Sequence, residues 1–185
     1  MTIAPPNTER FTVDEYMRRA ALEGWKRVEL EVGVVIEMST EHLHHARTIA
    51  NVSQRLVAAL PDADCFPCGT LPLSVFTAYE PDILVLDAVP PPDAMLPEAG
   101  HVSLVVEVAF SSRTRDLRAK ARYYAAAEIP EYRVVEPERG VLHRHTCPGP
   151  EGYAEVVPFD VGCFAESLDV LDVLAVLDVL DGRGA

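Results

Sequence analysis

The sequence has little positive charge and no hydrophobic run long enough to cross a membrane. Lys and Arg together number 16 against 29 Asp and Glu, which gives a formal net charge of −13 and a pI near 4.8. This acidity argues against a general polyanion-binding surface but leaves room for a local basic site. The longest apolar-rich tract, residues 168–180, is interrupted by three aspartates, and a membrane-spanning helix needs roughly 18 apolar residues. We therefore expect no membrane partner.

An export signal is also missing. Residues 1–10 contain two prolines, an Asn and a Glu, and lack the apolar core of a secretory signal peptide. We therefore expect a cytoplasmic protein whose four cysteines are thiols. Cys65 and Cys68 form a lone CxxC pair. Zinc at this pair is the minor alternative, because Cys147 and Cys163 do not supply a second local pair.

The length and composition indicate one globular domain. Hydrophobic residues make up 49% and charged residues 24% of the 185 residues, which excludes disorder and collagen-like repeats. We expect a single domain over residues 1–185, with an N-terminal helix and hairpin elaboration at 1–40 and a C-terminal tail at 160–185. The Leu-Asp-Val repeats of the tail favour a short helix that serves packing.

The order of predicted elements indicates an α/β fold. Thr12 and Glu15 form a capping box at the start of the first helix, and Gly24 ends it. The predicted elements are helices at 11–24, 41–60 and 114–128, a strand–turn–strand at 27–38, a loop at 61–67, strands at 71–76, 83–86, 102–110 and 131–136, and a hairpin at 141–145 and 153–159. This order predicts α/β or α+β architecture with a mixed central sheet flanked by helices.

Glu107 stands inside an otherwise apolar strand, Leu104-Val-Val-Glu-Val-Ala109. A carboxylate there is costly unless it is paired or binds a metal. Both interpretations are open: a metal ligand, or an ion pair with Arg113, Arg115 or Arg118.

Asp82 precedes the apolar run of residues 83–86. Alone it could be a simple turn former. Together with Glu107, however, two buried strands would each bring one carboxylate to the same place, and hard divalent cations such as Mg²⁺ require oxygen ligands of this kind.

Lys120 is one of two lysines in the chain and lies on the helix after the Glu107 strand. Asp116 and Lys120 are four residues apart, so they could form a surface pair, with Tyr124 one turn further on the same face. Alternatively, Lys120 reaches toward Glu107 and stabilises charge that develops on a phosphate.

The ordered series of motifs resembles the PD-(D/E)xK nuclease superfamily, and within it a bacterial restriction-endonuclease-like branch. The resemblance covers residues 11–158. The matching segments are Phe11-Thr-Val-Asp-Glu-Tyr16, Arg27-Val-Glu-Leu30, Gly33, Met38-Ser39, His45, Pro81-Asp82, Leu104-Val-Val-Glu-Val108, Asp116 with Lys120 and Tyr124, and Ile129-Pro-Glu-Tyr132.

This resemblance implies a restriction-endonuclease-like fold and a Mg²⁺-dependent (or Mn²⁺-dependent) endonuclease that hydrolyses phosphodiester bonds in DNA. Asp82 and Glu107 would hold the metal, with the carbonyl of Val108 as a further ligand. Lys120, together with His45 and Glu29, would complete the catalytic set. The metal would lower the pKa of bound water and neutralise the scissile phosphate. For His45 a surface or capping role is the alternative.

The sequence also departs from the family pattern. Ala109 stands where the superfamily's usual lysine lies, two residues after the Glu, so the lysine has moved to the helix as Lys120. The segment before Lys120 is one residue shorter than usual, which would turn Lys120 by about 100° on its helix unless the loop absorbs the change. Val32-Gly33-Val34 replaces the usual Asp-Gly-Glu.

Two other functions are therefore open. Residues 113–144 hold eight basic and five acidic residues, a net charge of +3 beside the candidate site, which suits a phosphate backbone or ordinary ion pairs on a helix face. The main alternative is a catalytically inactive module of the same fold that binds nucleic acid or protein as a homo-oligomer. A third is an oligomer whose carboxylates are only structural. A homodimer is the first expectation for its assembly.

Overall fold

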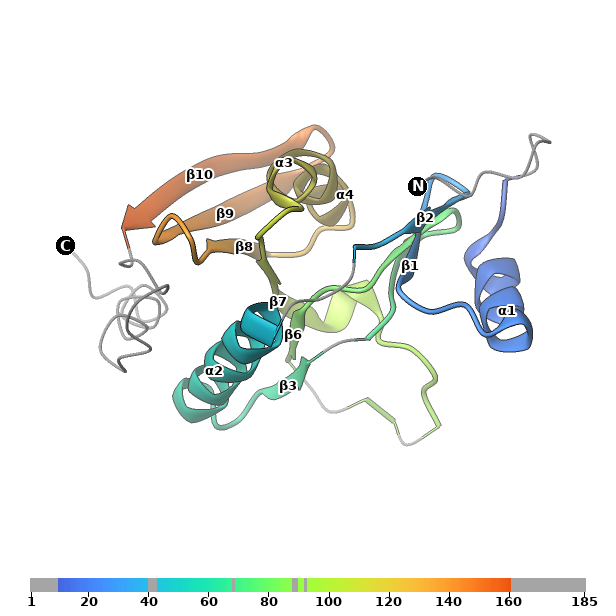
Figure 1. The fold of residues 1–185 in the computed structure, drawn as a ribbon, viewed down its shortest axis with the longest axis horizontal. Helices are drawn as coiled ribbons and strands as arrows, with labels where there is room; N and C mark the ends of the chain where they lie inside the picture. Colours follow the sequence, from blue (N-terminus) through green and yellow to red (C-terminus); the bar gives the residue numbers. More distant parts are fainter. Residues whose placement is uncertain (1–9, 40–42, 68, 88–89, 92, 161–185) are drawn as a thin grey trace.

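Two β-sheets, one large and one small, organise the protein (Figure 1). The computed structural model describes residues 10–39, 43–67, 69–87, 90–91 and 93–160. The large sheet has the strand order β10-β9-β8-β7-β6-β3 and the small sheet β2-β1-β5-β4. The strands are β1 Val28–Glu31, β2 Val34–Glu37, β3 Asp64–Pro67, β4 Leu71–Ser74, β5 Thr77–Tyr79, β6 Ile83–Leu86, β7 Val102–Val108, β8 Glu131–Glu136, β9 Val141–Gly149 and β10 Gly152–Asp160.

The large sheet is mixed, as the sequence predicted. Its neighbouring strands are antiparallel except β7 and β8, which run parallel. A parallel pair needs a crossover, and the helical segment between Arg113 and Ala126 supplies it. That segment consists of α3 Arg113–Arg115, a π-helical turn η2 Asp116–Lys120, and α4 Ala121–Ala126.

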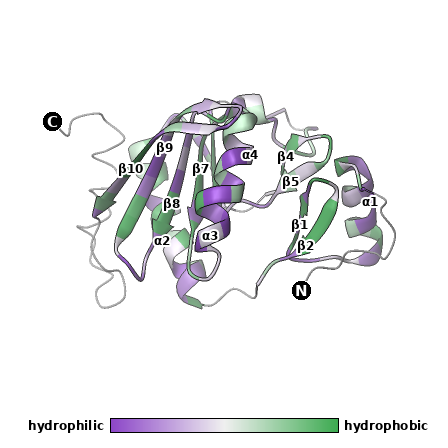
Figure 2. Ribbon diagram, turned by 90° about the horizontal axis from the view of Figure 1, so that it is seen from above, coloured by the Kyte–Doolittle hydropathy of each residue, from purple (hydrophilic) through white to green (hydrophobic). Residues whose placement is uncertain are grey.

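Helices cover both faces of the large sheet (Figure 2). Helix α2, Leu43–Ala59, packs Ile49, Val52 and Leu56 against one face. Tyr124 of α4 packs on the other face, against neighbours such as Val105. Because consecutive strand residues point to opposite faces, the apolar runs of β6 and β7 serve both cores. Figure 2 shows hydrophobic colour along β7 and hydrophilic colour over α3.

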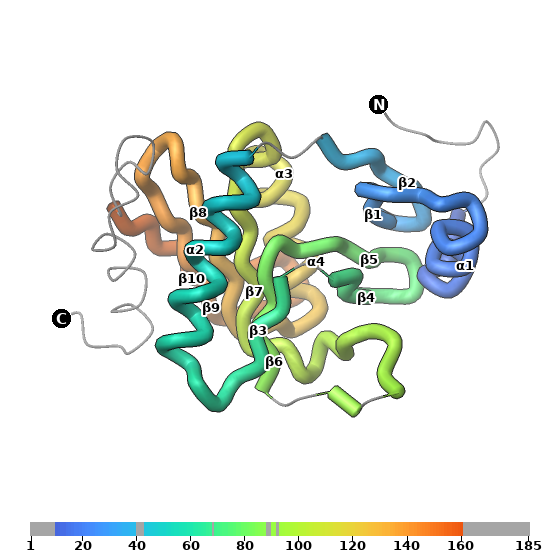
Figure 3. The backbone as a smooth tube through the Cα atoms, turned by 60° about the horizontal axis from the view of Figure 1, so that its bottom comes forward, coloured from blue at the N-terminus to red at the C-terminus, as the bar shows by residue number. Residues whose placement is uncertain are grey.

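The small sheet packs against the N-terminal helix α1, Val13–Glu23. The predicted Thr12–Glu15 capping box is present, and Gly24 ends the helix with φ of 67°. The β1–β2 turn has positive φ at both Val32 and Gly33, the conformation that a tight type I′ hairpin requires. The chain passes from β5 of the small sheet to β6 of the large sheet within a few residues (Figure 3). Asp82 is one of these connecting residues.

Three predicted elements are corrected by the structure. Residues 64–67, expected to be loop, form the edge strand β3, because pairing with β6 outweighs the local proline and aspartate signals. The strand expected at 71–76 is the start of the β4–β5 hairpin. The helix expected at 114–128 contains a π turn and ends at Ala126. The predicted tail helix lies outside the described residues.

Within the described ranges, no helix has the length and apolarity needed to cross a bilayer. Cys65 and Cys147 are free thiols, while Cys68 and Cys163 lie outside the described part of the chain.

Candidate active site

Asp82 and Glu107 meet where β6 and β7 run side by side. The antiparallel register pairs Ile83 with Val106, so Asp82 and Glu107 lie opposite one another at the next position. The Oδ2 atom of Asp82 accepts a hydrogen bond of 2.7 Å from the backbone amide of Val108. Both carboxylates are nearly buried, with 7% and 3% of the residue exposed. The structure therefore brings together the two predicted carboxylates.

The buried partner of Glu107 is Lys120. The Nζ atom of Lys120 donates to Oε1 of Glu107 at 2.8 Å, and the Tyr124 hydroxyl donates to the same oxygen at 2.9 Å. The alternative that Glu107 pairs with Arg113, Arg115 or Arg118 is wrong. Because Asp116 and Lys120 are both buried, the alternative of a surface pair is also wrong.

A π turn lies in the shortened segment before Lys120, where the sequence predicted that the lysine side chain could be rotated away from the site. Residues 116–120 form a π-helical turn, which holds more residues than an α turn and changes the direction of each side chain after it. With the segment one residue shorter than usual, Lys120 still reaches Glu107 at 2.8 Å. Tyr132 secures this turn through a hydrogen bond of 3.0 Å from its hydroxyl to the carbonyl of Asp116.

Glu29 connects the small sheet to the site. Its Oε1 atom lies 2.9 Å from Nζ of Lys120 and also accepts a hydrogen bond from the amide of Glu80 at 3.1 Å. Its Oε2 atom accepts from Arg115, which also contacts Glu31 at 3.2 Å. Sequence reasoning placed Glu29 near the site but missed the bridging role of Arg115. The only signal for it was its place in the basic segment that follows the Glu107 strand.

His45 reaches the site from α2. Its Nε2 atom lies 3.3 Å from Oδ2 of Asp82, and its side chain is 16% exposed. The ring packs edge-on against Phe110, with centroids 5.9 Å apart. This position favours a role in the site over the surface or capping role that the sequence left open.

Burial and mutual repulsion set the electrostatics of the cluster. Burial, together with the charges of Asp82 and Asp116, raises the pKa of Glu107 well above its usual range, against the opposing effect of Lys120. Burial also raises the pKa of Asp116. Burial alone would lower the pKa of Lys120, but the surrounding carboxylates, with Glu107 first, raise it above its usual value. The surrounding carboxylates therefore favour the charged form of Lys120.

Glu29 behaves differently from Glu107. Burial acts to raise its pKa, but Lys120 and Arg115 outweigh burial and hold the pKa below its ordinary value. Glu29 is consequently the ionised carboxylate that fixes Lys120 and Arg115 in place.

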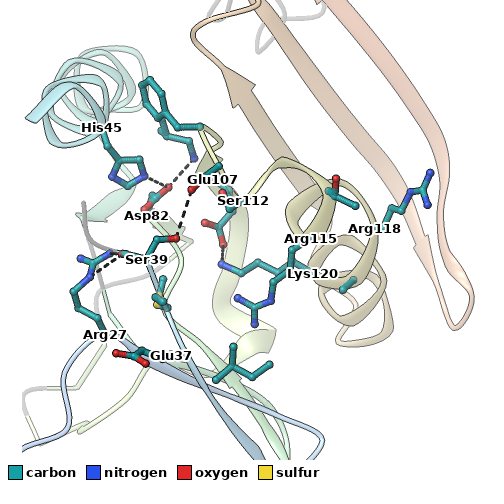
Figure 4. Close-up of a pocket in the computed structure, with 17 residues that line it drawn as sticks. Arg27, Glu37, Ser39, His45, Asp82, Glu107, Ser112, Arg115, Arg118 and Lys120 are labelled. Atoms are coloured by element: carbon teal, nitrogen blue, oxygen red, sulfur yellow. Dashed lines mark hydrogen bonds and ion pairs between the residues drawn. The ribbon is translucent and has the colours of Figure 1, made fainter. Parts of the chain in front are cut away.

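The site opens into a pocket of about 610 Å³ (Figure 4). Its lining includes the side chains of Asp82, Glu107, Lys120 and His45. The β1–β2 hairpin and the segment after β7 form its walls. The two walls approach each other at Ser39 and Ser111, whose Oγ atoms are 3.5 Å apart.

The donor set suits a Mg²⁺ ion that keeps part of its water shell. The described residues contain no group of three or more His, Cys, Asp or Glu side chains placed to enclose a metal ion. Mg²⁺, however, is usually held by one or two carboxylates together with water and substrate phosphate. Asp82 and Glu107 supply two carboxylates on the wall of an open pocket, and a cation there would offset the negative charges of Asp82 and Asp116 that act on Glu107. The residues present therefore fit such an ion.

Most of the basic segment is engaged in ion pairs inside the protein. Glu136 pairs with Arg113 and, at 3.7 Å, with Arg139. Glu131 pairs with Arg133 and, at 3.0 Å, with Arg144. The interpretation of ordinary ion pairs is thus correct for these arginines, and the segment as a whole is not a free basic surface.

Comparison with known proteins identifies the family and a protein of similar fold. The model of the Uma2 family, described as "Putative restriction endonuclease", matches residues 13–179. A solved structure of a protein from Anabaena variabilis, titled a putative nuclease belonging to DUF820, is similar with a TM-score of 0.63 and 15% sequence identity. The similarity covers 90% of this chain and 99% of that one, and it shows a shared fold. No curated protein matches the sequence.

Proposed function

Since the chain belongs to the Uma2 family of restriction-endonuclease-like proteins, we propose that it is a Mg²⁺-dependent or Mn²⁺-dependent endonuclease that hydrolyses phosphodiester bonds in DNA. The family membership supports a nuclease-like function. The observation that carries the finer proposal is the meeting of Asp82 and Glu107 in one open pocket, with the buried cation Lys120 bonded to Glu107.

In this proposal Asp82 and Glu107 would hold the metal, and the carbonyl of Val108 would be a further ligand. The bound ion would lower the pKa of a water molecule and neutralise the scissile phosphate. The hydrogen bond from the Val108 amide fixes Asp82, and the bonds from Lys120 and Tyr124 fix one oxygen of Glu107. The two carboxylates are thereby preorganised before substrate enters.

The remaining residues supply charge and proton transfer. Lys120, kept charged by its carboxylate neighbours, would stabilise negative charge that develops on the phosphate. Glu29 holds Lys120 and thus acts through it. His45, 3.3 Å from Asp82 at the pocket wall, is placed to assist the metal ligand or to accept a proton.

Plasmid nicking tests this proposal directly. Wild-type protein with Mg²⁺ or Mn²⁺ should convert supercoiled plasmid to open-circle or linear DNA. Asp82→Ala and Glu107→Ala should each abolish the conversion, and an exposed change such as Leu22→Ala should not. Nicking that survives both carboxylate substitutions would exclude this site as its source.

One observation favours a second candidate, a catalytically inactive module that binds nucleic acid or protein. The ammonium of Lys120 lies within 2.9 Å of two carboxylates, so its charge is already balanced. Ala109 also stands at the position of the superfamily's usual strand lysine. This candidate predicts binding that Lys120→Ala alters, without any metal-dependent turnover.

We further propose that the protein acts in the cytoplasm as a homodimer. Strand β10 is an edge strand of nine residues, and Val156 and Val157 on it are 51% and 46% exposed. A long edge strand with exposed apolar residues is a site for pairing with another chain. Light scattering coupled to size-exclusion chromatography should give twice the mass of 20.3 kDa, and a monomer across the micromolar range would contradict this assembly.

A further inference from the structure

The cationic side chains of the pocket differ in whether other groups of the protein already bind them through ion pairs or hydrogen bonds. Four Lys or Arg residues line it: Arg27, Arg115, Arg118 and Lys120. A DNA strand that enters the pocket brings one negative charge at each phosphate, and these cations are the first groups that could compensate it.

Three of the four are engaged by the protein itself. Lys120 pairs with Glu29 and Glu107. Arg115 pairs with Glu29 and Glu31. The guanidinium of Arg27 donates to the carbonyl of Ser39 at 3.1 and 2.5 Å. Binding a backbone phosphate by Lys120 or Arg115 would compete with buried ion pairs, and breaking such pairs is costly.

Arg118 is different. It is exposed and lines the pocket, and no ion pair or hydrogen bond joins it to another described residue. The hydroxyl-bearing residues Ser111 and Thr114 are exposed on the same wall. The opposite wall carries the exposed carboxylate of Glu37, which would repel a phosphate and offsets the charge of Arg27 on that same wall. The charge distribution therefore favours the Arg118 wall as the side along which a phosphate backbone runs.

The position of Arg118 separates it from the reacting atoms. In Figure 4 it lies beyond Lys120, on the side away from His45 and Asp82. A guanidinium presents paired donors that match a phosphate bidentately. Contacts of this kind fix the register of a strand and do not read its sequence.

We propose that Arg118 binds a backbone phosphate next to the scissile one, with Ser111 and Thr114 lining the same track, and that this contact positions the DNA strand over Asp82 and Glu107. The proposal rests on the proposed nuclease function. Arg118 is thus a positioning residue, and its loss should weaken substrate binding and leave the chemical step intact.

Arg118→Ala is compared with Arg122→Ala, its matched control. Arg122 is also exposed and lies one turn further along the same helical segment, but it does not line the pocket. Binding of a short DNA duplex is measured by fluorescence anisotropy in EDTA, where metal-dependent cleavage cannot occur, across a series of salt concentrations. Arg118→Ala should weaken binding about 10-fold and reduce the slope of log K against log salt by about 0.9, the value for one lost phosphate contact.

The other variants sharpen the result. Arg122→Ala should change neither quantity, and Arg118→Lys should keep the slope while losing part of the affinity. With Mg²⁺ present, Arg118→Ala should raise KM by about 10-fold at nearly unchanged kcat. Thermal unfolding of both alanine variants should match wild type, because both side chains are exposed.

Equal effects of Arg118→Ala and Arg122→Ala on the salt slope would overturn the proposal, as would a loss confined to kcat. Wild-type cleavage that Asp82→Ala abolishes, combined with an unaffected Arg118→Ala, would reject only the role of Arg118. A wild-type protein that neither binds nor cleaves DNA would reject the proposed function and this inference together.

Discussion

At the scale of single residues, the site depends on one buried lysine that serves two carboxylates. Lys120 joins Glu107 of the large sheet to Glu29 of the small sheet at 2.8 and 2.9 Å. All three residues are at most 3% exposed. Removing one member of such a buried group leaves the others with unbalanced charge, which costs more than the intact group contributes. The same contacts that prepare the site therefore also hold the two sheets together.

Glu29→Ala should destabilise the protein by about 3–5 kcal/mol, because Lys120 and Arg115 would lose a buried partner. The control is Glu37→Ala, a carboxylate of the neighbouring strand that is exposed, which should change the free energy of unfolding by less than about 0.5 kcal/mol. Urea unfolding of both variants measures this difference. Equal stabilities would show that the Glu29 ion pairs do not stabilise the fold.

His145 should make stability depend on pH. Burial lowers the pKa of this histidine from its usual 6.5, although the contact with the Tyr132 carbonyl opposes the shift. A base whose pKa is lowered by folding binds protons more readily in the unfolded state. The contribution of His145 to the free energy of unfolding is therefore complete above pH 6.5 and is lost as the pH falls below that value.

His145→Gln should therefore flatten the fall in unfolding free energy between about pH 7 and pH 5. His101→Gln, at an exposed position, serves as the control and should keep the wild-type slope. Urea unfolding at several pH values gives both slopes, and an unchanged slope in His145→Gln would contradict the assignment.

At the scale of elements, the β1–β2 hairpin carries an unfavourable residue. Val32 has φ of 51°, a left-handed conformation that is rare and costly for a β-branched side chain. Gly33 follows with φ of 80°, where glycine carries no such cost. This hairpin presents Glu29 to Lys120, so the strain lies close to a functional contact.

Val32→Asn should stabilise the protein by about 1 kcal/mol, because Asn tolerates positive φ and Asn-Gly is the favoured pair for this turn. The backbone amide of residue 32, which donates to Thr77 Oγ1 at 3.2 Å, is unaffected. Gly33→Ala is the opposite case, since its Cβ would lie 2.5 Å from Cβ of Arg10, and it should destabilise. Thermal unfolding separates the two, and a destabilised Val32→Asn would refute the turn assignment.

The elements also show how far the sequence predicted the fold. Strong local signals were sufficient for α1, where a capping box and a terminal glycine mark both ends, and for the apolar strands β6 and β7. Strand β3 was missed because only its pairing with β6 makes residues 64–67 extended. The π turn was missed because its hydrogen bonds are set by tertiary contacts such as that of Tyr132 with Asp116.

For the candidate site, the sequence predicted the two carboxylates but not the partners of Glu107. A charged residue inside an apolar strand is visible in sequence, so Glu107 and its relation to Asp82 could be expected, and the structure brings them together. The partners of Glu107 could not be settled, because three arginines and one lysine were all within reach in sequence. Only the folded backbone shows that Arg115 turns to Glu29 while Lys120 turns inward.

At the scale of the whole molecule, an acidic chain concentrates its chemistry at the junction of two sheets. The net charge of −13 opposes general DNA binding, and most arginines near the site are paired within the protein. Affinity for a phosphodiester would therefore depend on the few contacts inside the pocket, which act without metal, and a divalent cation would add to it. The central claim is that Asp82 and Glu107 together bind that cation.

The most direct test is the shift in thermal unfolding when millimolar Mg²⁺ or Mn²⁺ is added to wild type, Asp82→Asn and Glu107→Gln, each compared with itself in EDTA. An ion that binds only the folded state stabilises it by about 2.7 kcal/mol at 100 times its Kd. The account predicts a stabilising shift in wild type that both variants lose. A shift that persists in both variants, or no shift in wild type even with a DNA oligonucleotide present, would contradict a metal site built by Asp82 and Glu107.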